Sequence, residues 1–268
     1  MARGESRPFL KWVGGKRQLL PELSARVPER YGTFHEPFVG GGALFFAVRP
    51  AQAVLSDLNH RLVRTYKAIR DRVEDVIALL ETYPYESDFY YDFRRKLPDA
   101  REDHWLAAWM IYLNRAGYNG LYRVNSRNEF NVPFGRHTAP TICDAENLRA
   151  CSAALRGVEL RCEGFEGVLR RAVPGDFVYF DPPYAPLSET SYFTSYTQGG
   201  FGPTEQAKLR DVALELKGRQ VQILLSNSSA PLIRALYAQG FRLEEVLAAR
   251  NVNSKAERRG KLVELVIR

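Results

Sequence analysis

The sequence has few cysteines, and its apolar residues do not gather into long runs. Only three of its 268 residues are cysteine, Cys143, Cys151 and Cys162, and none has Cys-x-x-Cys spacing. A disulfide framework and a zinc site are therefore disfavoured, and reduced thiols are expected. No apolar run approaches the roughly 18 residues of a membrane span, and the first residues lack the apolar core of a secretory signal. We therefore expect a cytoplasmic protein that does not enter a membrane.

The chain also lacks a phosphate-binding loop of the Gly-x-x-x-x-Gly-Lys-Ser/Thr type, which disfavours hydrolysis of a nucleoside triphosphate. Basic charge is in excess, with 38 basic and 31 acidic residues and a formal net charge of +7. The excess is concentrated in residues 115–136 and 250–268, two stretches rich in polar and turn-forming residues. Basic charge gathered in this way is typical of a protein that binds a polyanion.

Strand and helix signals alternate at both ends of the chain, whose length fits one large domain or a domain with an insertion. Runs of β-branched and aromatic residues are separated by stretches with helical periodicity, such as Leu209 to Leu216 and Leu232 to Tyr237. This alternation predicts a twisted, mainly parallel sheet with covering helices. The expected strands are residues 33–38, 51–56, 158–162, 176–180, 221–225 and 262–267.

The middle of the chain has a different character, and residues 59–142 are interpreted as an insertion inside the α/β domain. Apolar residues between Leu58 and Leu80 recur at steps of three or four, which predicts one long amphipathic helix. Residues 105–113 are apolar nearly all round and predict a buried helix. Closely spaced Gly, Asn, Ser and Arg with aromatics from Gly117 to Gly135 predict a hairpin.

The tetrapeptide Asp181-Pro182-Pro183-Tyr184 directly follows the predicted strand at residues 176–180. Two prolines end the strand and its ladder bonding, so a carboxylate and an aromatic ring are expected at the carboxyl edge of the sheet, where open α/β folds bind ligands. Because prolines donate no N–H, nearby backbone carbonyls stay available as acceptors. Acceptors under an aromatic face suit a planar ring bearing an amino group, such as a nucleobase. A strand-ending turn with a capping Asp is the alternative.

A glycine turn follows the first predicted strand, in Glu36-Pro37-Phe38-Val39-Gly40-Gly41-Gly42, and opens a helix at Ala43. Glycines at such a turn let a ligand approach the backbone and leave helix N–H groups available. Asp57 ends the next strand, where an acidic residue typically bonds ribose hydroxyls. Together these features indicate a nucleoside-containing cofactor, although tight packing alone would also explain the glycines.

A third segment, Lys11-Trp12-Val13-Gly14-Gly15-Lys16, combines two cations, an aromatic ring and a flexible glycine pair. Lys16 is a candidate partner for a carboxylate or phosphate, and Trp12 is a candidate pocket wall. A surface loop pinned by a buried tryptophan is the alternative for this segment.

These three motifs, in the chain order 11–16, 36–42 and 181–184, resemble the alpha-group DNA adenine N6-methyltransferases (the D12 class), and especially the Dam type, which methylates adenine in GATC. Residues 112–123 and 129–136 resemble the target-recognition hairpin of that family, and residues 181–188, 225–227 and 262–265 match further motifs. The resemblance covers nearly the whole chain. Residues 251–260 depart from the Ser- and Gly-rich loop of enterobacterial Dam and resemble the restriction-system branch.

The resemblance implies a Rossmann-like methyltransferase sheet with helices on both faces, formed by residues 1–58 and 143–268. Residues 59–142 would be the mainly helical target-recognition domain with its β-hairpin. The implied methyl donor is S-adenosylmethionine, without a metal. Double-stranded DNA is the implied partner, to which the protein would bind as a monomer. The implied location is the prokaryotic cytosol or nucleoid, with a host- or phage-encoded gene. A cognate restriction endonuclease is a candidate second partner. The implied site residues are Asp181, Pro182 and Tyr184 for catalysis; Trp12, Lys16, Glu36, Phe38, Gly40, Asp57 and Asp181 for the cofactor; and Lys11, Tyr118, Asn119, Leu121, Arg123, Asn125, Pro133 and Arg136 for DNA.

The implied chemistry accounts for these residue types. The adenine amino group is a poor nucleophile, and hydrogen bonds from it to the Asp181 carboxylate and the Pro182 carbonyl would localise its lone pair toward the methyl donor. The sulfonium makes the methyl electrophilic, so neither a metal nor a covalent enzyme intermediate is required. Cytosine-C5 methylation would need a thiol, typically after proline, and no cysteine follows a proline. One alternative is adenine methylation at a different GAT-containing site, as in a restriction-modification system. A second is methylation of RNA or of a protein amide. A third is a DNA-binding module without activity.

Overall fold

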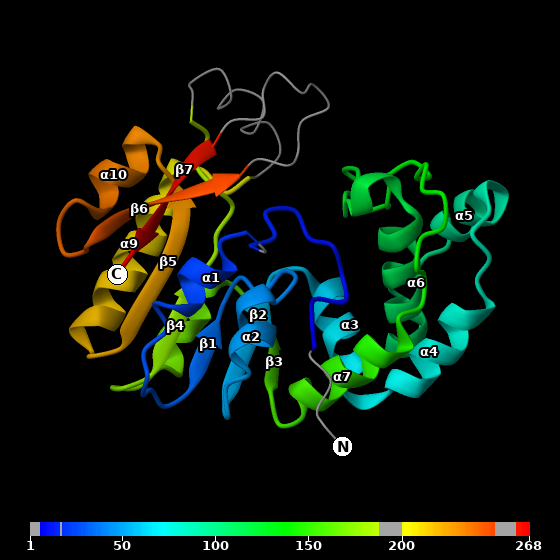
Figure 1. Ribbon diagram of the computed structural model, residues 1–268, viewed down its shortest axis with the longest axis horizontal. Helices are drawn as coiled ribbons and strands as arrows, with labels where there is room; N and C mark the ends of the chain where they lie inside the picture. The colour runs from blue at the N-terminus through cyan, green and yellow to red at the C-terminus, as the bar shows by residue number, and fades with distance from the viewer. Residues whose placement is uncertain (1–5, 17, 188–199, 250–260) are drawn as a thin grey trace. The chain divides into compact units, whose positions relative to one another are not determined.

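The computed structural model describes residues 6–16, 18–187, 200–249 and 261–268 (Figure 1). By its internal contacts the chain divides into two compact units, which are described in turn. Unit 1 comprises residues 1–15, 40–49 and 57–162, and unit 2 comprises residues 16–39, 50–56 and 163–268. Among the described residues, no helix is long and apolar enough to cross a membrane. Residues 251–260, which depart from enterobacterial Dam, lie outside the described ranges.

Unit 2 contains most of a seven-stranded sheet, and β3 (Glu159–Cys162) belongs to unit 1. The neighbouring strands of unit 2 follow the order β2-β1-β4-β5-β7-β6. The first four are parallel, whereas β7 pairs antiparallel with β5 and β6. This confirms the mixed α/β fold with a mainly parallel sheet. The strands are β1 (Phe34–Glu36), β2 (Ala53–Asp57), β4 (Phe177–Phe180), β5 (Gln222–Ser228), β6 (Leu243–Ala249) and β7 (Lys261–Ile267).

The central strand β4 is buried on both faces, which explains its continuous apolar run. Val178 and Phe180 belong to the apolar cluster on one face, and Phe177 and Tyr179, the alternate residues, point to the other. In the parallel register, Phe180 is opposite Leu225 of β5. The next pair is therefore Asp181 and Ser226, so the strand pairing brings a polar side chain of β5 beside the residue that ends β4.

Helices of unit 2 complete this apolar cluster. Leu209, Val212 and Leu216 of α9 are buried in it, as is Ile233 of α10. Helix α9 begins at a proline, and the side chain of Glu205 accepts a hydrogen bond from the backbone N–H of Gly202, which caps the first turn. Figure 1 shows α9 beside β5 and α10 next to α9. The helices of this unit are α1 (Leu20–Ser24), the 3₁₀ segment η2 (Phe165–Arg170), α9 (Pro203–Gly218) and α10 (Pro231–Tyr237).

Unit 1 is mainly helical and is organised around α6 (Asp103–Ala116). Every residue from Leu106 to Asn114 is buried, which confirms the predicted buried helix. Helices α3 and α4 pack against it, and α7 packs against both. The remaining elements are α2 (Ala43–Val48), α3 (His60–Asp71), α4 (Val73–Thr82), α5 (Ser87–Arg94), the 3₁₀ turn η1 (Tyr118–Gly120) and α7 (Ala145–Leu155).

The single long helix predicted from Leu58 to Leu80 is wrong, because α3 and α4 are separate helices. The chain leaves helical geometry at Arg72, with φ −137° and ψ 35°. The Arg72 N–H still closes the last turn of α3, and its guanidinium pairs with Asp75 in the first turn of α4. Both helices direct apolar residues toward α6. The spacing of apolar residues is therefore unchanged at Arg72, and the break could not be predicted from it.

The segment from Gly117 to Gly135 folds back on itself as an antiparallel hairpin, as predicted, and is called the recognition hairpin below. It is held by isolated bridges, Gly117 with Phe134 and Val124 with Phe130, and forms no regular strand. Its turn contains Asn128 in the left-handed region, with φ 60°. The first arm opens with η1, which interrupts strand geometry and accounts for the short pairing.

Candidate active site

Asp181 directly follows β4, the central strand, and is held by two side chains through one oxygen. Lys16 Nζ lies 2.6 Å from Asp181 Oδ1, and both side chains are largely buried, at 8% and 20% exposure. Ser226 Oγ donates to the same oxygen at 3.1 Å, as the strand register predicts. Ser226 also shares a hydrogen bond with the Tyr179 hydroxyl. The carboxylate is therefore fixed in orientation by the sheet beneath it and by the cation beside it.

The electrostatics of Asp181 are set by burial. Burial disfavours the charged carboxylate and raises its pKa above the usual value, while Lys16 and Ser226 act in the opposite direction. Burial likewise raises the pKa of Tyr179 and of Tyr184 well above the usual range, so both hydroxyls stay protonated. The protonation of Asp181 therefore depends on the balance between its burial and its contacts with Lys16 and Ser226.

The backbone that follows Asp181 is fixed by side chains of α9 and β5. Gln206 donates to the Pro183 carbonyl at 2.9 Å, and Asn227 donates in turn to Gln206. The Ala185 N–H bonds Asn227, and the Ala185 carbonyl accepts from Ser228. We call residues 181–185 the clamp segment, because it is bound on both sides of its prolines.

Two acceptors in the clamp segment remain without such partners. Among the described residues, none donates a hydrogen bond to the Pro182 carbonyl or to Asp181 Oδ2. The neighbouring carbonyl of Pro183 and the other oxygen of Asp181 are both bonded. An amino group with two hydrogens is the chemical complement of two such acceptors.

Tyr184 presents an aromatic ring in the same segment. Its hydroxyl donates to Glu264 Oε2 of β7 at 2.7 Å, which fixes the ring. Lys16 Nζ also lies 4.4 Å from the centroid of this ring, within cation–π range. One lysine therefore holds both the carboxylate and the aromatic ring that the sequence singled out.

Two further predicted residues of unit 2 lie at the end of β1. Glu36 is the last residue of the strand and is 2% exposed. Phe38 packs into an aromatic cluster, stacked on Phe165 at 5.4 Å between ring centroids and edge-on to Phe180 and Phe201. The described contacts of the Phe38 ring are thus with the apolar core.

In unit 1, the glycine turn and Asp57 are brought together. The Gly40 N–H donates to Asp57 Oδ2 at 3.2 Å, and Asn59 N–H donates to Oδ1 at 2.8 Å. Burial raises the pKa of Asp57, and these backbone hydrogen bonds oppose the shift. The Tyr66 hydroxyl of α3 donates to the Gly40 carbonyl at 3.1 Å. A side chain at Gly42 would clash with that hydroxyl at 2.7 Å, so the turn requires glycine.

Trp12 lies against the same glycine turn. A Cβ added at Gly40, where φ is +47°, would come within 2.7 Å of the indole Cδ1. The Tyr122 ring stacks on the indole, with ring centroids 5.4 Å apart and planes 19° from parallel. Within unit 1 the structure therefore brings Trp12, Gly40 and Asp57 together.

The predicted DNA residues cluster around the recognition hairpin of unit 1. Lys11 is tied to it by Asn114, a buried side chain that accepts from the Lys11 N–H and donates to the carbonyls of Lys11 and Gly120. A Cβ at Gly120 would lie 2.3 Å from the Lys11 side chain. Tyr118 N–H donates to the Pro133 carbonyl, which joins the two arms.

Most of the polar side chains of this hairpin are exposed. Arg123 is exposed. Its Nε donates to the Asn131 side-chain oxygen and its Nη2 donates to the Asn131 carbonyl. The other N–H donors of the guanidinium remain available for a ligand. Asn125 builds the turn, accepting from the N–H groups of Arg127 and Glu129. The exposed set also includes Lys11, Tyr118, Asn119 and Pro133, and Leu121 is half-buried.

A basic cavity of about 450 Å³ adjoins the hairpin in unit 1. Its lining includes the cations Lys11, Arg115 and Arg136, together with His137 and residues 138–141. Arg115 is anchored by donating to the Phe9 carbonyl at 2.9 Å. The two expected DNA residues Lys11 and Arg136 therefore line one polyanion-compatible surface.

Several residues that support this geometry were given no individual role from the sequence, although most of them lie in segments that resemble family motifs. They act through contacts between segments far apart in the chain, which periodicity and short motifs do not encode. The register of β4 and β5 would have pointed to Ser226 only once the pairing was known. These residues are Tyr66, Asn114, Tyr122, Asn131, Gln206, Ser226, Asn227 and Glu264.

An α/β sheet that carries Asp-Pro-Pro-Tyr after its central strand, in a chain that also contains a basic hairpin, is typical of amino-group methyltransferases that act on nucleic acid. The chain belongs to the D12 class of N6 adenine-specific DNA methyltransferases, whose sequence profile matches residues 12–252. It is accordingly an adenine-specific DNA methyltransferase with DNA as its substrate.

Relatives of established name are similar along nearly the full length. The Type II methyltransferase M1.LlaDCHI of Lactococcus lactis subsp. cremoris is 45% identical over 97% of this chain and 94% of its own. The Type II methyltransferase M.MjaIII of Methanocaldococcus jannaschii is 38% identical, covering 95% and 96%. The DNA adenine methylase of Escherichia coli K12 is 36% identical, covering 98% and 95%.

Proposed function

We propose that this enzyme transfers a methyl group from S-adenosylmethionine to N6 of adenine in duplex DNA, at GATC, after flipping the base out of the helix. The observation that carries the proposal is the pair of acceptors in the clamp segment. Asp181 Oδ1 is engaged by Lys16 and Ser226, while Oδ2 and the Pro182 carbonyl receive no hydrogen bond from the described residues. Family membership and the relatives named DNA adenine methylase support the substrate.

The two acceptors account for activation of the amino group. N6 of adenine is a poor nucleophile because its lone pair is delocalised into the ring. When Asp181 and the Pro182 carbonyl each accept one N6 hydrogen, the lone pair localises on nitrogen and the developing positive charge is stabilised. Gln206 and Asn227 keep the backbone in place, so these acceptors need not reorganise during the reaction.

Tyr184 positions the base. Its ring is held by Glu264 and by Lys16, which suits it to stack on an extruded adenine. Extrusion costs a few kcal/mol, which contacts of the recognition hairpin with the duplex offset. We assign Tyr118 to insertion into the base stack.

The cofactor set is Trp12, Lys16, Glu36, Phe38, Gly40, Asp57 and Asp181. The donor supplies an electrophilic methyl on a positively charged sulfur when it is bound. Asp57, fixed beside the glycine turn by the Gly40 N–H, fits the carboxylate that bonds ribose hydroxyls in such folds. The absence of room for side chains at Gly40 and Gly42 fits a turn that brings backbone close to a ligand.

The recognition role falls to residues 59–142, with residues 1–58 and 143–268 as the catalytic domain. We assign Lys11, Leu121, Arg123 and Pro133 to the bases of the site, and Asn119, Asn125 and Arg136 to the surrounding DNA. The cation-lined cavity with Lys11 and Arg136 supports this assignment. The enzyme acts as a monomer in the cytosol, and the two relatives named Type II methyltransferases favour a separate cognate endonuclease.

The test is methyl transfer from labelled S-adenosylmethionine to three duplexes of equal length and composition. One contains GATC, one contains GTAC, and one contains GAT followed by a base other than C. The proposal expects label in N6-methyladenine of the GATC duplex alone. Equal label in both GAT duplexes would overturn the four-base specificity, and no label in any duplex would overturn the proposed function.

A further inference from the structure

Tyr122 differs from the two residues that flank it in the recognition hairpin. Leu121 and Arg123 belong to the set assigned to DNA, and Arg123 is exposed. Tyr122 is half-buried and stacks on Trp12, a residue of the cofactor set, with 5.4 Å between ring centroids. One stretch of three residues therefore contacts both candidate ligand sites of unit 1.

The other contacts of Tyr122 fix its ring from behind. Phe130, on the opposite arm of the hairpin, packs edge-on against it at 5.8 Å and against Trp109 of α6 at 5.8 Å. The guanidinium of Arg61 lies 5.7 Å from the Trp109 ring. Arg61 donates to both oxygens of Asp99, at 2.8 and 2.5 Å. The hydrogen bond with Asp99 raises the pKa of Arg61, and Tyr122 acts in the same direction.

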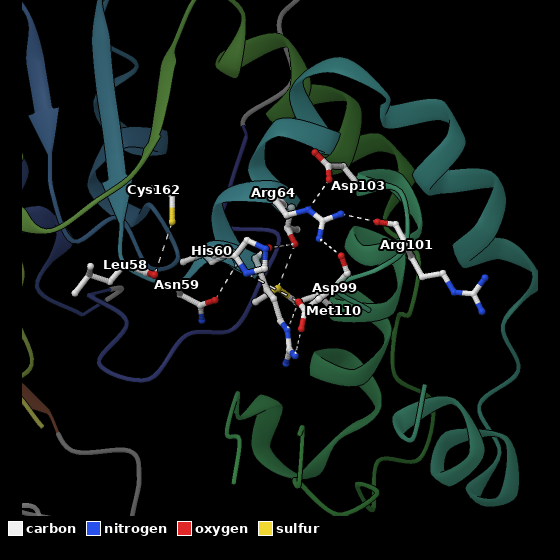
Figure 2. Close-up of polar contacts among 12 residues, drawn as sticks. Leu58, Asn59, His60, Arg64, Asp99, Arg101, Asp103, Met110 and Cys162 are labelled. Atoms are coloured by element: carbon white, nitrogen blue, oxygen red, sulfur yellow. Dashed lines mark hydrogen bonds and ion pairs between the residues drawn. The ribbon is translucent and has the colours of Figure 1, made fainter. Parts of the chain in front are cut away.

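This support is itself anchored in the helical part of unit 1. Figure 2 shows Arg64 joined to the segment that contains Asp99, Arg101 and Asp103. Arg64 donates to the carbonyls of Asp99 and Arg101 at 3.0 and 2.5 Å and to the Asp103 carboxylate. The Asp99 carboxylate that orients Arg61 thus has a fixed backbone.

Trp12 contacts the glycine turn as well as Tyr122. The glycine turn lies against the pyrrole part of the indole, so that a Cβ added at Gly40 would come within 2.7 Å of Cδ1. The indole therefore contacts both the glycine turn and Tyr122. Because the Gly40 N–H donates to Asp57, one series of contacts joins Tyr122, Trp12 and this carboxylate.

We infer that Tyr122 is a positioning residue that couples site-specific DNA binding to cofactor binding. This inference rests on the proposed function. DNA that engages Leu121 and Arg123 fixes the first arm of the hairpin, and with it the Tyr122 ring and the Trp12 wall. Cofactor binding is therefore tighter in the presence of a GATC duplex, and by linkage DNA binding is tighter with cofactor bound.

The experiment measures the Kd of S-adenosylhomocysteine, a non-reactive probe, by calorimetry on the full chain. Titrations are made without DNA, with a GATC duplex and with a GTAC duplex. For the wild type we expect the GATC duplex to tighten binding by roughly 5- to 150-fold, the usual range of such coupling. Tyr122→Leu removes the stacked ring and should bring this ratio close to one, whereas Tyr122→Phe keeps the ring and should retain it.

Other outcomes overturn the inference. They are a wild-type ratio of one, a Tyr122→Leu ratio equal to that of the wild type, and a Tyr122→Phe ratio as low as that of Tyr122→Leu. Arg127→Ala, in the exposed turn of the same hairpin, is the matched control and should keep the wild-type ratio. The labelled-transfer assay judges the proposed function separately, because a methyltransferase without coupling would still label the GATC duplex.

Discussion

The clamp segment and the recognition hairpin are both short, irregular pieces of chain that carry assigned function, yet they are held in different ways. The clamp segment is fixed by side chains of neighbouring elements, Gln206, Asn227, Ser228 and Glu264. The hairpin is held by backbone hydrogen bonds between its arms and by side chains of unit 1 that bond its backbone, such as Tyr90 and Arg94 to the Val132 carbonyl, whereas its own polar side chains remain exposed.

The difference follows from what each segment does in the proposed function. An acceptor pair that stabilises developing charge works best when it is already oriented, so its surroundings are rigid and largely buried. Side chains that read bases must reach out to a second molecule, so they stand on a fixed backbone and stay solvated until DNA arrives. Substitutions in the clamp segment should therefore affect turnover, and those in the hairpin should affect specificity.

The largest effect is expected for Asp181→Asn. The substitution replaces a charged acceptor by an amide and weakens the interaction with Lys16, and loss of one such stabilising group typically costs on the order of 100- to 1,000-fold in kcat. Single-turnover methylation of a GATC duplex measures this loss, with DNA affinity unchanged. Asp211→Asn on α9 is the matched control, and Asp181→Asn with near wild-type turnover would refute the assigned role.

For the hairpin, Arg123→Ala should relax specificity. Loss of a bidentate contact with guanine removes about 1–3 kcal/mol of discrimination, or roughly 5- to 150-fold, at one position of the site. The ratio of kcat/KM for GATC and singly altered duplexes measures it. Arg127→Ala removes a cation from the same turn and should leave the ratio unchanged, whereas an equal change in both variants would point to general electrostatics.

The pH dependence of turnover sharpens the contrast. Burial raises the pKa of Asp181 and Lys16 lowers it, so Lys16→Met should raise that pKa further. Because the ionised carboxylate is the acceptor, activity is lost as pH falls through this pKa, and the acid limb of the kcat profile should move to higher pH. Lys208→Met, exposed on α9, is the control. An unmoved limb would show that another group controls the acid side.

The smallest effect is expected for Tyr184→Phe. The ring is kept and one hydrogen bond to Glu264 is lost, which corresponds to about 0.5–1.5 kcal/mol, or roughly 2- to 10-fold in kcat. Tyr31→Phe, where the ring packs on Phe177 at the start of β4, should have no effect on kcat. A Tyr184→Phe loss as large as that of Asp181→Asn would mean that the hydroxyl itself takes part in the reaction.

Local sequence patterns predicted the parts of the fold that are locally determined. The apolar run of β4 ended by two prolines, the glycine turn followed by α2, and the buried helix α6 were all predictable from their own residues. The break at Arg72 was not, because the apolar periodicity continues through it. Strand β6 was also missed, since Leu, Glu and Ala favour a helix and only pairing with β7 makes this segment a strand.

The supporting contacts of the site were beyond prediction for a related reason. Tyr122 and Trp12 are far apart in sequence, as are Gln206 and Pro183, and no short motif records that they meet. The chemistry-bearing residues could be nominated from motifs and family resemblance. The side chains that orient them required the fold.

The most direct test of the account is a crystal structure of the enzyme with a GATC duplex and S-adenosylhomocysteine. The account predicts an extruded adenine whose N6 lies at hydrogen-bond distance, about 2.7–3.2 Å, from both Asp181 Oδ2 and the Pro182 carbonyl. An adenine that remains stacked in the duplex, or an N6 bonded to neither acceptor, would contradict it.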